Sequence, residues 1–234
     1  MNYDKSVLLL FLISLSVIGC QNTSEPAAEE AAMTETTGAA ANDTTQSEKV
    51  ILFFGNSLTA GYGLEPSEGF PALIQQKLDS LGYEYRAVNA GLSGETTASG
   101  VSRLEWVLER QPVDIFVLEL GANDGLRGIE PAETQENLNT IIEKVRAANP
   151  EVEIVLAGMM VPPNMGPEYA ERFQQVFPEV AEAKDVTLIP FLLENVAGEP
   201  ELNQADGIHP TAEGQEIVAQ TVWEVLNPLL EETS

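Results

Sequence analysis

The sequence predicts an α/β fold in which a five-stranded parallel sheet is covered by helices on both faces. Five short apolar runs alternate with segments whose apolar residues recur every three or four positions, the patterns of buried strands and amphipathic helices. Strands that are separated by helices pair in parallel, and both faces of such a sheet are buried. The chain has 234 residues, 44% of them hydrophobic, which is enough for one core of this kind.

The elements follow one another in a regular order. The run Val-Ile-Leu-Phe-Phe at 50–54 ends at Gly55 and is typical of a buried strand. Glycine and proline mark the helix ends: Gly82 is placed to cap one helix, and Pro131 to open another. Further strands are expected at 85–88, 113–120, 152–160 and 186–191, and helices on the stripes 70–81 (Phe70, Leu73, Ile74, Leu78, Leu81), 101–108, 131–145, 169–180 and 211–226.

Residues 1–19 have the features of an export signal. Their apolar run is shorter than the 20 or so residues that a membrane-spanning helix needs, and it fits the central region of a signal peptide. The run ends in Val-Ile-Gly-Cys, which resembles the lipobox of bacterial lipoproteins. The resemblance implies lipidation of Cys20 and a lipid-anchored place in the cell envelope, at the outer membrane in a Gram-negative cell because Gln21 follows. The alternative is an ordinary signal peptide with a chance cysteine.

Residues 20–48 are expected to be a tether. After Cys20 they are dominated by Ala, Thr, Glu and Ser, with several acidic residues and no basic one. Such a segment cannot bury enough apolar surface to offset its chain entropy, so it should be disordered. The folded domain is then expected to span residues 49–234.

Composition limits the chemistry. The net charge of −26 argues against nucleic acid as a partner and disfavours polyanionic substrates. A single cysteine allows neither an intrachain disulfide nor a cysteine zinc site, and we expect no metal or cofactor. The acidity itself is typical of a soluble protein or of adaptation to a salty habitat. His209 is the only histidine, so a mechanism that needs a neutral imidazole base must use it.

Four polar clusters follow the predicted strands, at 55–64, 89–96, 121–128 and 206–210. The carboxyl ends of parallel strands share one edge of the sheet, so we expect these clusters to meet there. Together they supply what acyl transfer requires: a serine (Ser57), a base (His209), a carboxylate to orient that base (Asp206), and glycine-bounded loops with an asparagine amide for the oxyanion. Taken singly, each has a structural alternative as a helix cap, a turn or a helix start.

The clusters Gly-Asn-Ser-Leu-Thr-Ala-Gly-Tyr-Gly-Leu, Gly-Ala-Asn-Asp-Gly-Leu-Arg-Gly and Asp-Gly-Ile-His-Pro, in this order, resemble those of the GDSL or SGNH hydrolases, and most closely the bacterial thioesterase–lysophospholipase–arylesterase branch. The resemblance covers residues 50–226 and implies a three-layer, flavodoxin-like α/β/α fold.

By that resemblance Ser57 is the nucleophile, and Asp206 and His209 complete the triad. The oxyanion hole would consist of the N–H groups of Ser57 and Gly94 and the amide of Asn123. Gly94 is preferred to Gly91 because of its place in Ser-Gly-Glu-Thr. One departure is Asn56, where the family name specifies Asp; activity is expected to survive it, because that position is not the triad acid.

The sequence therefore predicts a serine esterase that hydrolyses aryl, acyl or lysophospholipid esters through an acyl-serine intermediate. Its partners would be a small ester or lipid and, through Cys20, a membrane; we expect a monomer. The segment 159–167, rich in methionine and proline, is either a flexible apolar wall beside the acyl chain or an ordinary surface loop. The alternatives are a glycan O-acetyl esterase of the same fold and a non-catalytic binding lipoprotein.

Overall fold

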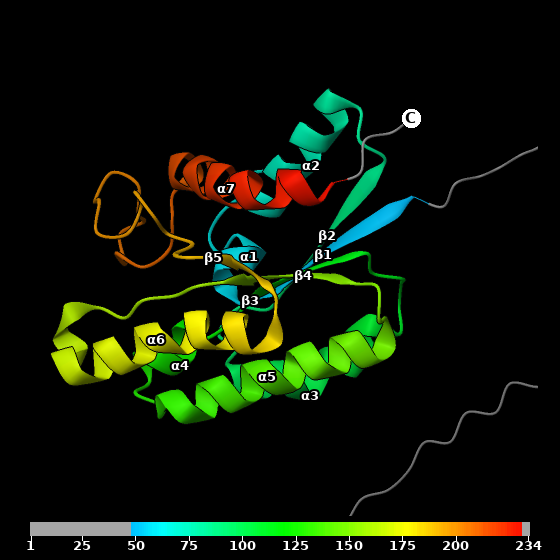
Figure 1. The fold of residues 1–234 in the computed structure, drawn as a ribbon. Helices are drawn as coiled ribbons and strands as arrows, with labels where there is room; N and C mark the ends of the chain where they lie inside the picture. The colour runs from blue at the N-terminus through cyan, green and yellow to red at the C-terminus, as the bar shows by residue number, and fades with distance from the viewer. Residues whose placement is uncertain (1–47, 231–234) are drawn as a thin grey trace, which may run out of the picture. The chain divides into compact units, whose positions relative to one another are not determined.

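The computed structural model describes residues 48–230, which contain a five-stranded sheet between two layers of helices (Figure 1). All the strand pairings are parallel, and the strand order is β2-β1-β3-β4-β5. The expected α/β fold with a five-stranded parallel sheet is confirmed. The strands are β1 (Lys49–Gly55), β2 (Tyr85–Gly91), β3 (Ile115–Glu119), β4 (Glu153–Ala157) and β5 (Thr187–Ile189).

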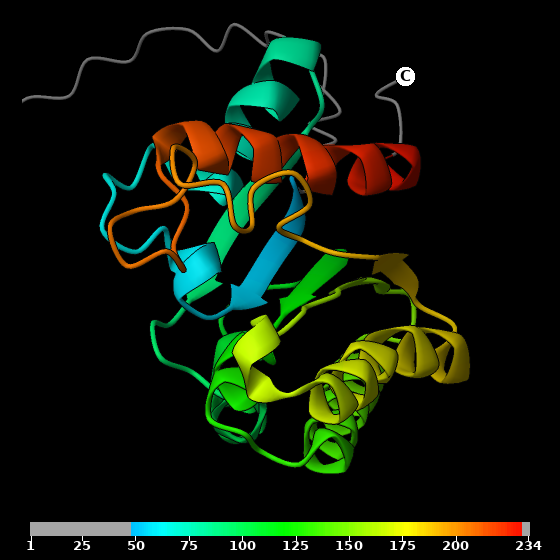
Figure 2. The ribbon, with the colours of Figure 1, turned by 90° about the vertical axis from the view of Figure 1, so that its left-hand side faces the viewer.

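The helices divide between the two faces of the sheet, as Figures 1 and 2 show. Helices α2 (Phe70–Leu81) and α7 (Ala212–Leu226) pack against each other on one face. On the other face α5 (Pro131–Ala148) packs between α3 (Thr97–Leu108) and α6 (Pro167–Lys184). Two short helices, α1 (Ser57–Ala60) and α4 (Ala122–Leu126), directly follow β1 and β3, and single 3₁₀ turns lie at Pro163–Met165 and Asn227–Leu229.

Helix α2 shows how the local sequence sets an element. Pro71 lies in its first turn, where the missing N–H costs no hydrogen bond, and Gly82 ends it at a φ of 78°, a backbone conformation that favours glycine. Of the predicted stripe, Phe70, Ile74 and Leu78 are completely buried, whereas Leu81 is 58% exposed. Leu81 is the last helical residue, so it lies beyond the part of the helix that packs on the sheet.

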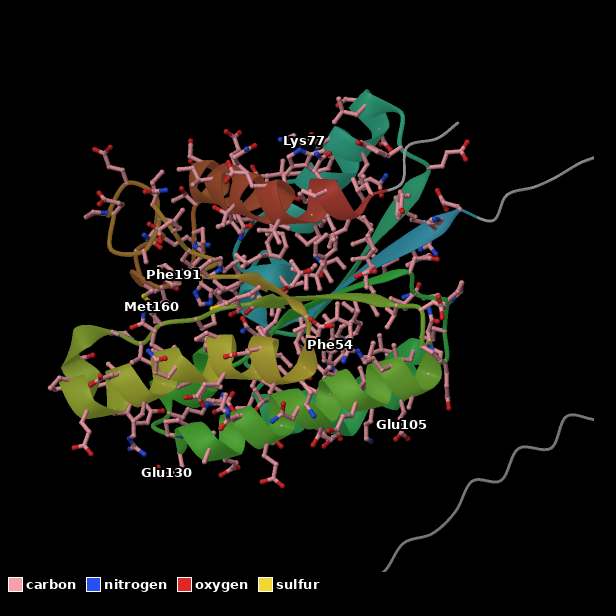
Figure 3. The ribbon with its side chains drawn as sticks, viewed as in Figure 1. Phe54, Lys77, Glu105, Glu130, Met160 and Phe191 are labelled. Atoms are coloured by element: carbon pink, nitrogen blue, oxygen red, sulfur yellow. The ribbon has the colours of Figure 1, made fainter. Side chains whose placement is uncertain are left out.

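The core lies on both faces of β1 and β3, the central strands. Residues 51–54 and 115–118 are completely or almost completely buried, and Figure 3 shows Phe54 between the sheet and the lower helices. Phe54 packs on Phe116 with the ring centroids 5.5 Å apart. Gly55 is in register with Gly91 on one side and Glu119 on the other, so three strands end at the same level.

The element boundaries differ from the predicted ones in both directions, and β2 runs to Gly91 where the sequence predicted a strand at 85–88. Strands β3, β4 and β5 are shorter than the apolar runs that indicated them, because buried residues at both ends of a run can belong to the connecting loops. Helix α3 begins four residues earlier than predicted, where the Thr96 side chain accepts from the N–H of Ser99. The predicted signal at 1–19, Cys20 and the predicted tether at 20–48 lie, apart from Glu48, outside the described residues. Among residues 48–230 no helix is long and apolar enough to cross a membrane.

Candidate active site

The first loop of the site is a tight turn from strand to helix. After β1 ends at Gly55, the Asn56 side chain caps α1 by accepting from the N–H of Leu58 at 3.0 Å. Ser57 is thus the first residue of the helix, and Asn56, not Ser57, provides the N-cap. A Cβ atom on Gly55 would come within 2.5 Å of the Glu119 carboxylate, so the turn needs glycine there.

Ser57, His209 and Asp206 form one hydrogen-bonded line, although 152 positions of the chain separate the serine from the histidine. The Ser57 Oγ atom lies 2.9 Å from His209 Nε2, and His209 Nδ1 lies 2.7 Å from Asp206 Oδ2. These distances are within direct hydrogen-bonding range. The structure therefore brings together the three residues that the sequence pointed to for a nucleophile, its base and the group that orients the base.

The Asp206 carboxylate organises the loop that carries the histidine. Its Oδ1 atom accepts from the backbone N–H groups of Ile208 and His209, and its Oδ2 atom faces the ring. The side-chain hydrogen bond with His209, helped by the two backbone donors, lowers the pKa of Asp206 to about 2. Asp206 is therefore ionised at neutral pH, as it must be to stabilise a protonated imidazole. On the other side of the ring, Tyr62 packs at a centroid distance of 4.6 Å.

The predicted oxyanion donors come from the loops after β1, β2 and β3. Asn123 lies in α4 and lines the same cavity as Ser57, and its Nδ2 atom donates to the carbonyl of Glu95 at 3.0 Å. An amide nitrogen carries two N–H groups, so one remains for a substrate oxygen. Gly94 is not among the residues that line the cavity. Gly94 has a φ of 81°. The N–H of the alternative donor, Gly91, already donates to the Asn89 side chain at 2.9 Å, and this favours Gly94 as the donor to the oxyanion.

A buried ion pair fixes the second loop. Glu95 is almost fully buried and pairs with Arg103 on α3. The same guanidinium donates to the carbonyls of Gly55 and Ala90, the end of β1 and the end of β2. Its carbon lies 3.9 Å from the centre of the Phe54 ring. The loop that contains Gly94 is thus held to the ends of β1 and β2 through Arg103. Arg127 also donates a hydrogen bond to the Gly94 carbonyl.

An apolar cavity of about 570 Å³ opens beside Ser57. Its polar lining side chains are Asn56, Ser57, Asn123, Asn203 and His209. Figure 3 shows Met160 and Phe191, which both line it, near each other on that side of the molecule. Of the segment 159–167, residues 159–162 form part of the wall. The apolar lining comprises Leu58, Ala122, Leu126, Met159, Met160, Val161, Pro162, Phe191, Leu193, Ala197 and Ile208.

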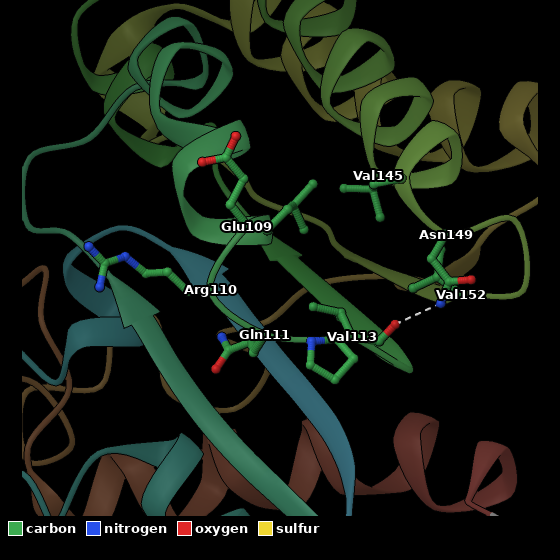
Figure 4. Close-up of a pocket in the computed structure, with 10 residues that line it drawn as sticks. Glu109, Arg110, Gln111, Val113, Val145, Asn149 and Val152 are labelled. Carbon is green, nitrogen blue, oxygen red and sulfur yellow. Dashed lines mark hydrogen bonds between the residues drawn. The ribbon is translucent and has the colours of Figure 1, made fainter. Parts of the chain in front are cut away.

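A second cavity of about 560 Å³ lies at the opposite edge of the sheet, by the amino ends of β3 and β4 (Figure 4). Asn149 and Val113 both line it, and the Asn149 side chain donates to the carbonyl of Val113. Its other polar side chains are Glu109, Arg110 and Gln111, and none of its lining residues is a serine, cysteine or histidine. Within residues 48–230 no group of three or more His, Cys, Asp or Glu side chains is arranged to hold a metal ion.

Two residues that the sequence did not single out connect parts of the site. Glu119, at the end of β3, is 1% exposed and accepts hydrogen bonds from the nucleophile loop. Burial raises the pKa of Glu119 to about 7, although its four hydrogen bonds act in the opposite direction. Gln204 joins the Ser57 and His209 segments by donating to the carbonyls of Tyr62 and Pro210. The only signal for Glu119 was its place near the end of the otherwise apolar run 113–120, which also contains Asp114.

A model described as the GDSL-like Lipase/Acylhydrolase family matches residues 53–217. The chain is 44% identical over 182 residues to "Esterase TesA" of Pseudomonas aeruginosa, covering 78% of this chain and 90% of that protein. It is 38% identical over 184 residues to "Thioesterase 1/protease 1/lysophospholipase L1" of Escherichia coli K12, with coverages of 79% and 86%. The crystal structure of the psychrotrophic esterase EstA from Pseudoalteromonas superposes with a TM-score of 0.73 at 33% identity, covering 77% of this chain and 98% of that one.

Proposed function

The chain belongs to the GDSL-like lipase/acylhydrolase family and is an ester hydrolase, and we propose that Ser57 is the nucleophile that carries the acyl group. The observation that supports this role is the line of hydrogen bonds from Ser57 Oγ through the His209 ring to Asp206, beside an apolar cavity that Ser57 and His209 line. A serine hydroxyl becomes an effective nucleophile only when such a base removes its proton.

The reaction would proceed in two halves. His209 Nε2 takes the hydroxyl proton while Ser57 Oγ attacks the ester carbonyl carbon, and Asp206 stabilises the imidazolium that forms. The N–H of Ser57, the amide of Asn123 and the N–H of Gly94 receive the oxyanion, and one such donor is worth about 10²–10³ in rate. His209 then gives its proton to the leaving alcohol. Water, activated by the same ring, hydrolyses the acyl-Ser57 ester and restores the serine.

We propose that the acyl chain of the substrate lies in the apolar cavity. A volume of about 570 Å³ falls within the range of about 300–1,000 Å³ found for ligand pockets, and an acetyl group would leave most of it empty. Aryl and acyl esters and lysophospholipids are therefore better candidates than acetylated glycans. Two relatives carry the names arylesterase and lysophospholipase, which supports the same classes. The acidic chain disfavours anionic thioesters such as acyl-CoA.

We further propose that the enzyme works as a lipid-anchored monomer in the cell envelope. The supporting observations are the lipobox-like end of the apolar run at Cys20 and the acidic segment without basic residues that follows it. All the side chains assigned to the reaction come from one chain, so catalysis needs no second copy. Radiolabelled palmitate incorporation in expressing bacteria tests the anchor, and the Cys20→Ala chain should take up no label.

The proposed reaction is tested with the full chain and p-nitrophenyl esters of increasing acyl length. Ser57→Ala should lose nearly all hydrolysis, and His209→Ala should do the same because the described chain offers no other imidazole. Ser102→Ala is the matched control, since that serine is exposed on α3 and bonds only within its own helix. We expect kcat/KM to rise from acetyl to medium chains as the cavity fills.

Substantial turnover by Ser57→Ala would contradict the role of Ser57. An optimum at the acetyl ester would instead favour the glycan O-acetyl esterase, and esters of acetylated sugars would then be the next substrates to assay. If no ester of any length is hydrolysed in a Ser57-dependent way, the chain is a binding lipoprotein of the same fold.

A further inference from the structure

The Glu119 carboxylate accepts four hydrogen bonds from the nucleophile loop. Its Oε2 atom accepts from the N–H of Asn56 at 3.0 Å, the N–H of Thr59 at 3.2 Å and the Thr59 hydroxyl at 2.7 Å. Its Oε1 atom accepts from Asn56 Nδ2 at 2.7 Å. All four donors are neutral, and the residue is 1% exposed. A carboxylate in such a place is costly to bury, and no step of the hydrolysis described above uses it.

This contact fixes which way the Asn56 amide points. Only the nitrogen of the amide can donate to a carboxylate, so the Asn56 oxygen must lie on the other side. There it accepts from the N–H of Leu58 at 3.0 Å and, at 3.3 Å, from the Ser57 hydroxyl, which lies closer to His209 Nε2, at 2.9 Å. A reversed amide would leave the N–H of Leu58 without its acceptor. It would also direct an N–H at Ser57 Oγ and occupy a lone pair that the attack on the ester needs.

We propose that Glu119 is a positioning residue for the nucleophile, acting through the Asn56 amide to hold Ser57 Oγ in the orientation that His209 can deprotonate. The inference rests on the proposed role of Ser57 and adds a residue that does not touch the substrate. The register of the sheet supports it, because Glu119 pairs with Gly55 and a Cβ at Gly55 would displace the carboxylate.

The contact between Asn56 and Glu119 can be tested by exchanging the amide and the carboxylate between the two positions. In Asn56→Asp two carboxylates would face each other at a distance where both cannot be ionised, so they must share a proton. In Glu119→Gln two amide nitrogens would face each other, and the Asn56 amide would reverse to avoid this. In the double variant Asn56→Asp/Glu119→Gln every donor again meets an acceptor: the Gln nitrogen donates to the new carboxylate, whose second oxygen accepts from Leu58.

The experiment measures kcat and KM of the full chain and the three variants with p-nitrophenyl butyrate, together with their thermal unfolding. Glu119→Gln should lose about 10- to 100-fold in kcat, the size of effect that a small misplacement of a reacting group produces, while KM changes less than about threefold. Asn56→Asp should stay within about fivefold of the wild-type kcat, because the shared proton keeps the two side chains bonded to each other. The double variant should return to within about fivefold of the wild-type kcat. Recovery by exchange distinguishes positioning from a general loss of structure.

A Glu119→Gln chain with wild-type kcat would overturn the inference. So would a double variant that is no better than Glu119→Gln, whether it folds or not, because restored pairing predicts both folding and turnover. If a single variant does not fold, the double variant decides the question alone. Failure of the proposed function is separate and visible in the wild-type chain, as hydrolysis that is absent or survives Ser57→Ala.

Discussion

Asp206 holds the backbone of its own turn with one carboxylate oxygen and the His209 ring with the other. The side chain is 38% exposed, whereas the ring beside it is 17% exposed. In the proposed role of Asp206, solvent would weaken the attraction of its carboxylate for a protonated His209 ring. Hydrogen bonds must therefore do most of the work of orienting the His209 ring. Asp206 makes three of them, one with the ring and two with the backbone N–H groups of Ile208 and His209.

Asp206→Asn should keep the shape of the turn and lose most of the activity. An amide at this position can hold the wrong tautomer of the imidazole and cannot stabilise its charge, so kcat should fall by about 10²–10⁴. Asp185→Asn is the matched control, because Asp185 is exposed and has a φ of 50°, a conformation that asparagine also adopts. An Asp206→Asn enzyme within a few-fold of the wild-type kcat would remove Asp206 from the triad.

The same substitution has a signature in stability. The pKa of Asp206 is lowered from 3.8 to about 2 in the folded chain, so the carboxylate stabilises the fold fully above about pH 4 and progressively less as pH falls towards 2. Urea unfolding followed between pH 5 and 2 should show a shallower loss of free energy in Asp206→Asn than in the wild type. Equal slopes would mean that the bonds of Asp206 do not stabilise the folded state.

Among the helices, the sequence predicted the ones with several turns of apolar spacing and missed the short ones. Helices such as α5 and α6 show several turns of apolar spacing between proline and the next loop, and their positions were predicted. Helices α1 and α4 have four and five residues, less than two turns, so no periodicity can indicate them. Yet they carry Ser57 and Asn123, which were found through residue type and their place after strands.

Contacts between elements could not be predicted for a different reason. The role of Glu119 depends on the register between β1 and β3, and no local pattern records which residue of one strand lies beside Gly55 of another. Gln204 likewise has an ordinary loop sequence around it. Its bond to Tyr62 exists only once segments 142 residues apart have met.

Gln204 is therefore expected to matter more for rate than its exposed loop suggests. Its amide donates at 2.7 Å to the carbonyl of Tyr62, in the serine loop, and at 2.9 Å to that of Pro210, next to the histidine. Gln204→Glu replaces the donor by a carboxylate facing two carbonyls, and the two loops should separate slightly. We expect kcat to fall by about 10- to 100-fold, with a smaller change in KM.

Gln174→Glu on the exposed side of α6 provides the charge-matched control, and both variants are compared on one p-nitrophenyl ester. Wild-type kcat in Gln204→Glu would show that the two loops keep their places without this clamp.

Over the whole described chain, the reactive groups gather at one edge of the sheet. The loops after β1, β2 and β3 and the long connection after β5 each supply part of the site, while the loop after β4 supplies part of the cavity wall. This is the edge at which parallel α/β sheets bind ligands. It explains why four short polar clusters, each compatible with a simple turn, together indicated one reaction.

The most direct test of the account is to find which atom reacts with an ester-like inhibitor. A p-nitrophenyl alkylphosphonate transfers its phosphonyl group to an activated nucleophile and releases p-nitrophenolate, and the adduct is then mapped by peptide mass spectrometry. We predict one phosphonyl group per chain, on Ser57, with complete loss of ester hydrolysis and no labelling of Ser57→Ala. Complete inactivation with the label on any other residue would contradict the assignment of Ser57 as the nucleophile.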